Sequence, residues 1–188
     1  MTFGKLLAQV AFALCFSLVV VCSTTNASAQ AAGDGVRDFD WEIGTWDTVV
    51  RVRAPLVENA PWTEFRGVSV VYDFAEGRAN LVELDVAAGE RRIEGVSLRL
   101  YNPQTGQWSI NFANMRDGLL TSPVYGGFEN GRGVFYGQDS VDGRFVQVRF
   151  VISDVTRESA RFVQSYSPDG GHTWIENWVA VDTRRRER

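Results

Sequence analysis

Cysteine, lysine and histidine are almost missing from this chain. Its two cysteines, Cys15 and Cys22, lie in an apolar segment near the N-terminus, the only lysine is Lys5, and the only histidine is His172. If the N-terminal segment is removed, the folded chain has no disulfide, no thiol nucleophile and no lysine for a Schiff base. One histidine excludes a metal site built on several imidazoles, and a Ser-His-Asp triad would have to use it.

The N-terminal segment has the parts of a secretory signal peptide. A short positively charged stretch ends at Lys5, and a mostly apolar run covers 6–22. Ala27-Ser28-Ala29 places small residues at positions −3 and −1 of a signal-peptidase site, so we expect cleavage after Ala29 and a periplasmic or secreted mature protein. The run approaches the length of about 20 residues that spans a bilayer, so an uncleaved membrane anchor is the alternative interpretation.

The charge balance and length after this segment suggest one mildly acidic domain. Without 1–29, 18 basic and 23 acidic residues remain, which gives a net charge of −5. Acidic proteins are poor candidates for nucleic-acid binding, and we expect no nucleic-acid partner, no metal and no cofactor. We predict a flexible segment over 30–37, one folded domain over 38–183, and a basic, disordered tail over 184–188.

The domain alternates between short strands and tight turns. In 80–87, for example, Val82, Leu84 and Val86 alternate with acidic residues. Asn-Gly and Asp-Gly pairs supply the positive φ of two-residue hairpin turns, and such short connections force neighbouring strands to run antiparallel. About ten strands in meander order predict an all-β, up-and-down barrel, because closure removes the exposed edges. The expected strands are 45–53, 64–74, 80–87, 92–101, 108–115, 124–129, 133–140, 144–155, 160–166 and 174–181.

A short motif opens this domain. Asp38-Phe39-Asp40-Trp41-Glu42-Ile43 predicts a helical turn, and Gly44-Thr45-Trp46 follows it at the start of the first strand. The glycine lets the chain bend into the strand, and the tryptophan can cover an open barrel end. This start resembles the N-terminal signature of the lipocalin-like calycins, in which a short helix plugs the barrel.

Four further stretches are similar to exported, lipocalin-like proteins of bacteria, a family without an established activity. The resemblance implies a barrel that holds a small, mostly apolar molecule in its interior, and it supplies no catalytic residue. The stretches that carry it are 80–86, 97–114, 149–154 and 167–178.

The apolar strand faces are candidates for lining the interior. Side chains can fill the interior of an eight-strand barrel, and a ten-strand barrel is wider. One interpretation is therefore an interior cavity for a small hydrophobic or amphipathic ligand. Close packing against Trp41 and Trp46 is the other. The candidate ligand-binding residues are Tyr72, Leu84, Leu98, Arg99, Trp108, Phe112, Arg149 and Phe150.

Polar residues at mid-strand positions leave other functions open. Glu83, Arg99, Asn111 and Arg149 are predicted opposite the apolar face, where they would be solvated. If part of this face turned inward, the two arginines could hold a carboxylate or phosphate. Acid–base catalysis by Glu83 or Asp85 would need a shifted pKa, so we assign no catalytic residue. A calycin-type isomerase, cyclase or hydrolase and an envelope interaction module without a ligand are the alternatives to a ligand-binding protein.

The stretch SPDGGHTW (167–174) resembles the Asp-box of bacterial sialidases. In this short, unrepetitive chain it occurs once, between the last two predicted strands. Asp169 can accept hydrogen bonds from turn amides, the two glycines allow positive φ, and Trp174 can pack back onto the sheet. We therefore interpret the motif as a hairpin clasp, with His172 at an exposed tip.

Overall fold

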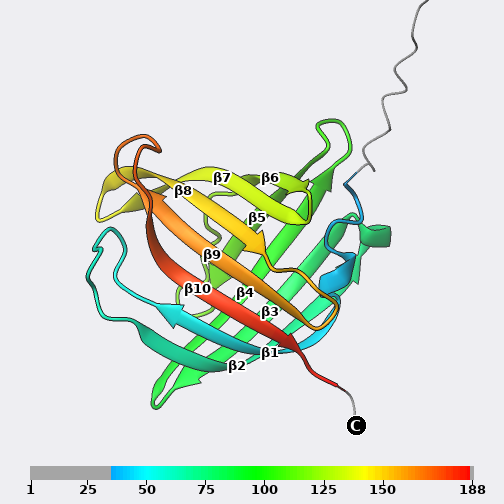
Figure 1. Ribbon diagram of the computed structural model, residues 1–188, viewed down its shortest axis with the longest axis horizontal. Coiled ribbons are helices and arrows are strands. Elements are labelled where there is room, and N and C mark those ends of the chain that lie inside the picture. Colours follow the sequence, from blue (N-terminus) through cyan, green and yellow to red (C-terminus); the bar gives the residue numbers. More distant parts are fainter. Residues whose placement is uncertain (1–34, 187–188) are drawn as a thin grey trace, which may run out of the picture. The chain divides into compact units, whose positions relative to one another are not determined.

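The computed structural model describes residues 35–186, which form a closed antiparallel barrel of ten strands (Figure 1). Each strand pairs with its neighbours in the chain, and β1 closes the barrel against β10. The predicted ten-strand meander is thus confirmed, while the expected signal peptide over 1–29 lies outside the described residues. The elements are η1 (Asp40–Glu42), β1 (Gly44–Val52), β2 (Thr63–Phe74), η2 (Ala75–Gly77), β3 (Ala79–Ala88), β4 (Arg91–Asn102), β5 (Gln107–Asn114), β6 (Val124–Glu129), β7 (Arg132–Val141), β8 (Arg144–Ser153), β9 (Ser159–Ser167) and β10 (Ile175–Arg184).

The hairpin turns follow from their sequences. Asn130-Gly131 and Asp142-Gly143 have positive φ at both residues, which is the backbone that a two-residue turn needs to match the twist of its strands. Within 35–186, the chain has no helix that is both long and apolar enough to cross a membrane.

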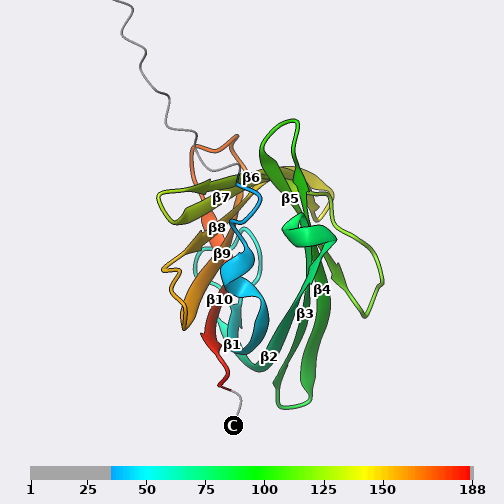
Figure 2. The ribbon, with the colours of Figure 1, turned by 90° about the vertical axis from the view of Figure 1, so that its right-hand side faces the viewer.

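The η1 segment lies at one end of the barrel, which we call the η1 end. Figure 2 faces this end, where the blue turn lies between the strands on the two sides. Phe39, just before η1, is 2% exposed and packs edge-to-face on Trp108 of β5 at 4.9 Å between ring centroids. Trp46 of β1 packs edge-to-face on Trp41 and donates its Nε1 hydrogen to the carbonyl of Glu42 at 2.6 Å. These contacts attach η1 to the barrel through four aromatic rings.

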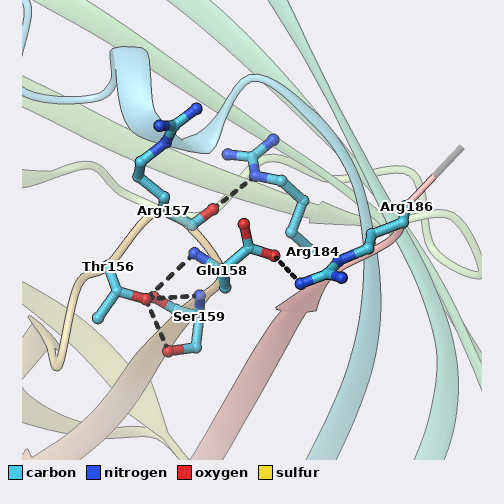
Figure 3. Close-up of polar contacts among 6 residues, drawn as sticks. All are labelled: Thr156, Arg157, Glu158, Ser159, Arg184 and Arg186. Atoms are coloured by element: carbon cyan, nitrogen blue, oxygen red, sulfur yellow. Dashed lines mark hydrogen bonds and ion pairs between the residues drawn. The ribbon is translucent and has the colours of Figure 1, made fainter.

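The C-terminal end of β10 contacts the β8–β9 connection. Arg184 donates Nε to the carbonyl of Arg157 at 2.7 Å, and Arg186 forms an ion pair with Glu158 (Figure 3). Arg184 also donates to the carbonyl of Ile43 at 2.9 Å. Strand β10 therefore reaches the first residue of the predicted tail and is held there by side-chain hydrogen bonds.

Most of the core consists of inward side chains from around the barrel. Val50, Phe65, Val86 and Ala180 form one cluster, and a larger cluster surrounds Phe39, Trp108 and Phe135. Full burial of such a side chain contributes roughly 1.5–3 kcal/mol. In β3, β5 and β8 the residues predicted for the interior, Leu84, Trp108, Phe112 and Phe150, are on the inward face.

In β2 and β4 the predicted inward face is wrong. Ser69 and Val71 of β2 are buried, and Tyr72 is 43% exposed on the outside. In β4 it is Arg99 that is buried and Leu98 that faces outward, because successive strand residues alternate between the two faces. The outward residues of these strands are Val68, Val70, Tyr72, Phe74, Val96, Leu98 and Leu100.

Barrel closure determines which face of β2 and which face of β4 points inward. Ser69 lies opposite Trp46 of β1 and Leu84 of β3, and both partners point inward. Arg99 lies opposite the buried Asn80 and Ile110. Since directly opposed residues share a face, the neighbouring strands fix the direction that the apolar pattern of β2 and β4 leaves ambiguous.

The SPDGGHTW turn joins β9 to β10 as predicted. Asp169 accepts hydrogen bonds from the Thr173 amide at 2.9 Å and the Thr173 hydroxyl at 2.7 Å. Ser167 accepts one from the Gly171 amide at 2.7 Å, and Trp174 donates Nε1 to the carbonyl of Gly171 at 3.0 Å. The interpretation as a hairpin clasp, with an exposed His172, is confirmed.

Candidate functional site

A cavity of about 130 Å³ lies inside the barrel. Its lining comes from η1 and from eight of the ten strands. The charged residues Glu42, Arg99 and Asp182 lie toward the η1 end, in a layer that we call polar. Four aromatic residues lie farther along the strands, together with Ser97 and Gln164, in a layer that we call apolar. Strand register defines these two layers. Thr48 of β1 lies opposite Asp182 of β10 in the polar layer, and Val50 lies opposite Ala180 in the apolar layer.

Two aromatic pairs border the apolar part of the cavity. Phe112 of β5 meets Trp178 of β10 at 6.2 Å between ring centroids, and Phe150 of β8 meets Phe162 of β9 at 5.0 Å. Both pairs are edge-to-face, an arrangement that adds to the stability gained from burial. Gly95 of β4 makes room for the first pair, because a Cβ there would lie 2.3 Å from Cζ of Phe112.

A buried ion pair borders the polar part. Arg99 of β4 donates Nη1 and Nη2 to the two carboxylate oxygens of Glu42 in η1, the Nη2 bond being 3.1 Å long. The Arg99 guanidinium also lies over the ring of Phe39 at 4.5 Å. Burial lowers the pKa of Arg99 to about 9, and the negative charge of Asp182 opposes this shift. Arg99 is therefore protonated at neutral pH and paired with Glu42.

A hydroxyl chain leads to a second carboxyl group. Thr48 donates its hydroxyl to Oδ1 of Asp182 at 2.6 Å, and Ser69 in turn lies 2.8 Å from the Thr48 oxygen. Burial raises the pKa of Asp182, while the Thr48 hydrogen bond and the charge of Arg99 oppose the rise. Thr48 Oγ1 already uses its hydrogen on Asp182, so the Ser69 hydroxyl is the donor between the two.

Half of the predicted ligand-binding residues come together at this cavity. Leu84, Arg99, Phe112 and Phe150 line it. Trp108 is instead in the core near η1, where its Nε1 donates to the carbonyl of Gly35 at 2.9 Å.

The other three predicted residues, Tyr72, Leu98 and Arg149, lie on the outside of the barrel. The Tyr72 hydroxyl donates to Glu83 at 3.3 Å, and the Arg149 guanidinium lies over the ring of Trp174 at 4.4 Å. Arg149 thus does not join Arg99, and the suggested arginine pair is not formed.

The sequence interpretation missed the two carboxyl groups of the polar layer. The sequence pattern assigns Glu42 only to a helical turn, because its ion pair with Arg99 bridges 57 positions of sequence. Asp182 has the same parity as the inward Trp178 and Ala180, so extending the alternation of the last predicted strand would have identified it. The two carboxylates considered for catalysis, Glu83 and Asp85, are outside the barrel, and hydrogen bonding to Arg92 lowers the pKa of Asp85.

Comparison with known proteins provides evidence on the fold. The chain matches no protein-family model, and it matches no curated protein. An S-type phycobiliprotein lyase from Guillardia theta has a similar structure, with a TM-score of 0.56 and 11% sequence identity over 80% of this chain and 92% of the lyase chain. At this identity the likeness concerns the fold alone, and together with the closed ten-strand barrel it supports a calycin-like architecture.

Proposed function

We propose that this protein binds a small, mainly apolar molecule with one polar group inside its barrel. The observation that carries the proposal is the division of one internal cavity into an aromatic part and a part bordered by Arg99, Glu42 and Asp182. Burying ionisable groups costs several kcal/mol per ion, and an apolar core of the same volume is often at least as stable. Stability alone therefore gives little reason to place three such groups beside empty apolar space.

The size of the cavity limits the ligand. An apolar cavity of about 150 Å³ holds one benzene molecule, whereas sites for drug-sized ligands are roughly 300–1,000 Å³. The 130 Å³ cavity is in the first class. The ligand is therefore a molecule of about one ring, unless the cavity expands on binding. The similarity to a phycobiliprotein lyase is compatible with interior binding but does not argue for a particular ligand.

Filling the apolar layer provides the main test. Ala180 lines the cavity, and its neighbour Val181 is 44% exposed on the outside of the same strand. We expect toluene to shift NMR resonances of cavity-lining residues in the unmodified protein, and Ala180→Leu to abolish these shifts. Val181→Leu is the matched control and should bind toluene normally. Unchanged toluene binding in folded Ala180→Leu, or no binding to the unmodified protein, would contradict the proposal.

Export of the protein is a separate part of this proposal. It is supported by the signal-like pattern over 1–29 and the small residues before Gln30. Mass spectrometry of the protein from a periplasmic extract of a bacterial host should give a mature chain that begins at Gln30. The same native spectrum should show any ligand acquired in the cell as added mass. A full-length chain found only in the membrane fraction would contradict cleavage.

A further inference from the structure

Among the inward-facing residues, the polar part of the cavity has two carboxyl groups, Glu42 and Asp182, but one guanidinium, Arg99. Both terminal nitrogens of Arg99 bind Glu42, so these two charges compensate each other. Asp182 is left with the hydrogen bond from Thr48, which engages Oδ1. Among the hydrogen bonds of residues 35–186, none reaches Oδ2 of Asp182. Within the part of the chain that the structure describes, this oxygen is therefore an acceptor without a partner, on a residue that lines the cavity.

Two other arginines near the η1 end, Arg184 and Arg161, are not partners of Asp182 within the described residues. Arg184 is the next inward residue of β10, and its guanidinium lies over Trp46 and donates to main-chain carbonyls. Arg161 borders the cavity from an outward position of β9, between the inward residues Ala160 and Phe162. No ion pair within the described part of the chain joins either side chain to Asp182.

Asp182 differs in accessibility from the unpaired donors nearby. Trp41 Nε1 and Arg99 Nε also lack hydrogen-bond partners among the described residues, but surrounding protein atoms cover both nitrogens completely. Asp182 keeps part of its surface exposed and lines the cavity. A ligand can therefore reach the carboxylate without rearranging the site, whereas an acceptor group on a ligand cannot reach either nitrogen.

The spacing along β10 suits a ring with a short substituent. Trp178, Ala180 and Asp182 alternate on the inward face, and two residues of a strand advance about 6.6 Å. A ring over the small Ala180 side chain would contact Val50 and Phe162, which lie opposite Ala180 on the two neighbouring strands. One methylene group beyond the ring would bring a donor to the level of Asp182.

We propose that the ligand is a one-ring molecule with a hydrogen-bond donor on a short arm, a protonated amine above all, and that Asp182 binds this donor. The inference rests on the proposed function, because it concerns the same cavity. It names the polar group that the cavity selects. A carboxylate in the same place would face the unpaired carboxyl group of Asp182 and would be rejected.

Four probes of similar size and different polar groups test this selectivity. Benzylamine, benzyl alcohol, toluene and benzoate would be titrated into the unmodified protein at neutral pH and followed by NMR. We expect benzylamine to bind most tightly, at least about tenfold better than toluene, because hydrogen bonds to charged groups are the stronger ones. Benzoate should bind most weakly. Toluene or benzoate binding as tightly as benzylamine would overturn the inference and leave the proposed function intact.

Variants assign the selectivity to Asp182. Asp182→Asn keeps an oxygen for the Thr48 hydroxyl and should lower benzylamine affinity about tenfold or more while toluene affinity changes less than about twofold. Asp85→Asn makes the same charge change on the outside and should leave both affinities unchanged. Unchanged benzylamine affinity in Asp182→Asn would overturn the inference. Failure of all four probes to bind the unmodified protein would overturn the proposed function and this inference together.

Discussion

The guanidinium of Arg99 and the carboxylate of Glu42 form an ion pair inside the barrel, with only 9% and 12% of the two side chains exposed. The pair joins β4 to the segment before β1, and the Arg99 side chain also packs on Phe39. It thus attaches η1 to the wall of the barrel beside the cavity. A buried pair of this kind adds little net stability, because the attraction between the two charges mainly offsets the cost of burying them.

Removing one member of this pair should be far worse than removing both. Glu42→Gln leaves the Arg99 charge buried without its partner, and we expect a loss of about 3–5 kcal/mol in the free energy of unfolding. The double variant Glu42→Leu/Arg99→Met replaces both charges by apolar groups and should recover most of this loss. Urea denaturation of the single and double variants measures the difference.

An exterior pair provides the control for this cycle. Asp85 and Arg92 form an ion pair on the surface, where each side chain is at least half exposed. Exposed pairs contribute about 0–1 kcal/mol, so Asp85→Asn should change the free energy of unfolding by less than about 1 kcal/mol. A double variant of the buried pair no more stable than Glu42→Gln would contradict the argument.

Asp182 should reduce stability at neutral pH. Burial raises its pKa in the folded protein, so folding favours the protonated form. The stabilisation that protonated Asp182 provides is fully present below the pKa of an unfolded aspartate, about 3.9. It is lost as the pH rises through the higher pKa that Asp182 has in the folded protein. Asp182→Asn should therefore be the more stable protein at pH 7, with a higher Tm in thermal unfolding.

The pH dependence distinguishes this explanation from a change in packing. The difference in free energy of unfolding between Asp182→Asn and the unmodified protein should shrink as the pH falls toward 4. Denaturant titrations of both proteins at several pH values between 4 and 7 measure it. A difference that stays constant over this range would show that ionisation of Asp182 is not its cause.

The barrel can be predicted from the sequence because each strand and each hairpin turn is recognised from a short stretch of residues. Alternation in 80–87 and Gly-containing turns such as Asn130-Gly131 identify strands and hairpins one at a time. In β2, however, Val70 and Val71 are adjacent, so period-two alternation fits either face. The correct face depends on β1 and β3, which meet β2 only after the barrel has closed.

The candidate site was predicted only in its apolar part for a related reason. Leu84, Phe112 and Phe150 belong to strands with one clearly apolar face, and all three line the cavity. The polar layer combines Glu42 and Asp182, which are 140 positions apart: Glu42 lies in a turn without period-two alternation, and Asp182 lies one residue beyond the last predicted strand. Their approach is a consequence of the pairing of β1 with β10, which spans the whole domain.

The clasp at Asp169 should titrate at unusually low pH. Hydrogen bonds from the Thr173 amide and hydroxyl and from Ser167 lower the pKa of Asp169 to about 2. The stabilisation that the carboxylate provides is therefore present above about pH 3.9 and is lost as the pH falls toward 2. An NMR titration should give a carboxyl midpoint near 2, with the Thr173 amide shift following it. A midpoint near 4 would contradict the hydrogen-bonded clasp.

Substitution of Asp169 should loosen the turn locally. Asp169→Ala removes the acceptor of two Thr173 hydrogen bonds, so hydrogen exchange of the Gly171 and Thr173 amides should become faster at pH 7. His172→Ala is the matched control, because this exposed side chain is not part of the clasp. Equal exchange rates in Asp169→Ala and the control would contradict a role for the carboxylate in the turn.

A methyl group added at Gly95 should change the cavity by displacing the ring of Phe112. A Cβ at this position would lie 2.3 Å from Cζ and 2.5 Å from Cε2 of Phe112, so the ring must move. Phe112 borders the cavity beside Trp178, and displacement of its ring would change the space available to a ligand. We expect Gly95→Ala to lower the free energy of unfolding by about 1–3 kcal/mol, as overpacking does, and to weaken toluene binding.

Gly127 provides the control for this substitution. It lies in β6, and a Cβ there would meet no atom within 4 Å. Gly127→Ala should keep toluene binding and should not lower stability, because alanine restricts the unfolded chain more than glycine does. Thermal unfolding and toluene titrations of both variants test the argument. If Gly95→Ala binds toluene as well as Gly127→Ala, the position of Phe112 does not control the cavity, and the aromatic wall has to be assigned to Phe150 and Phe162 alone.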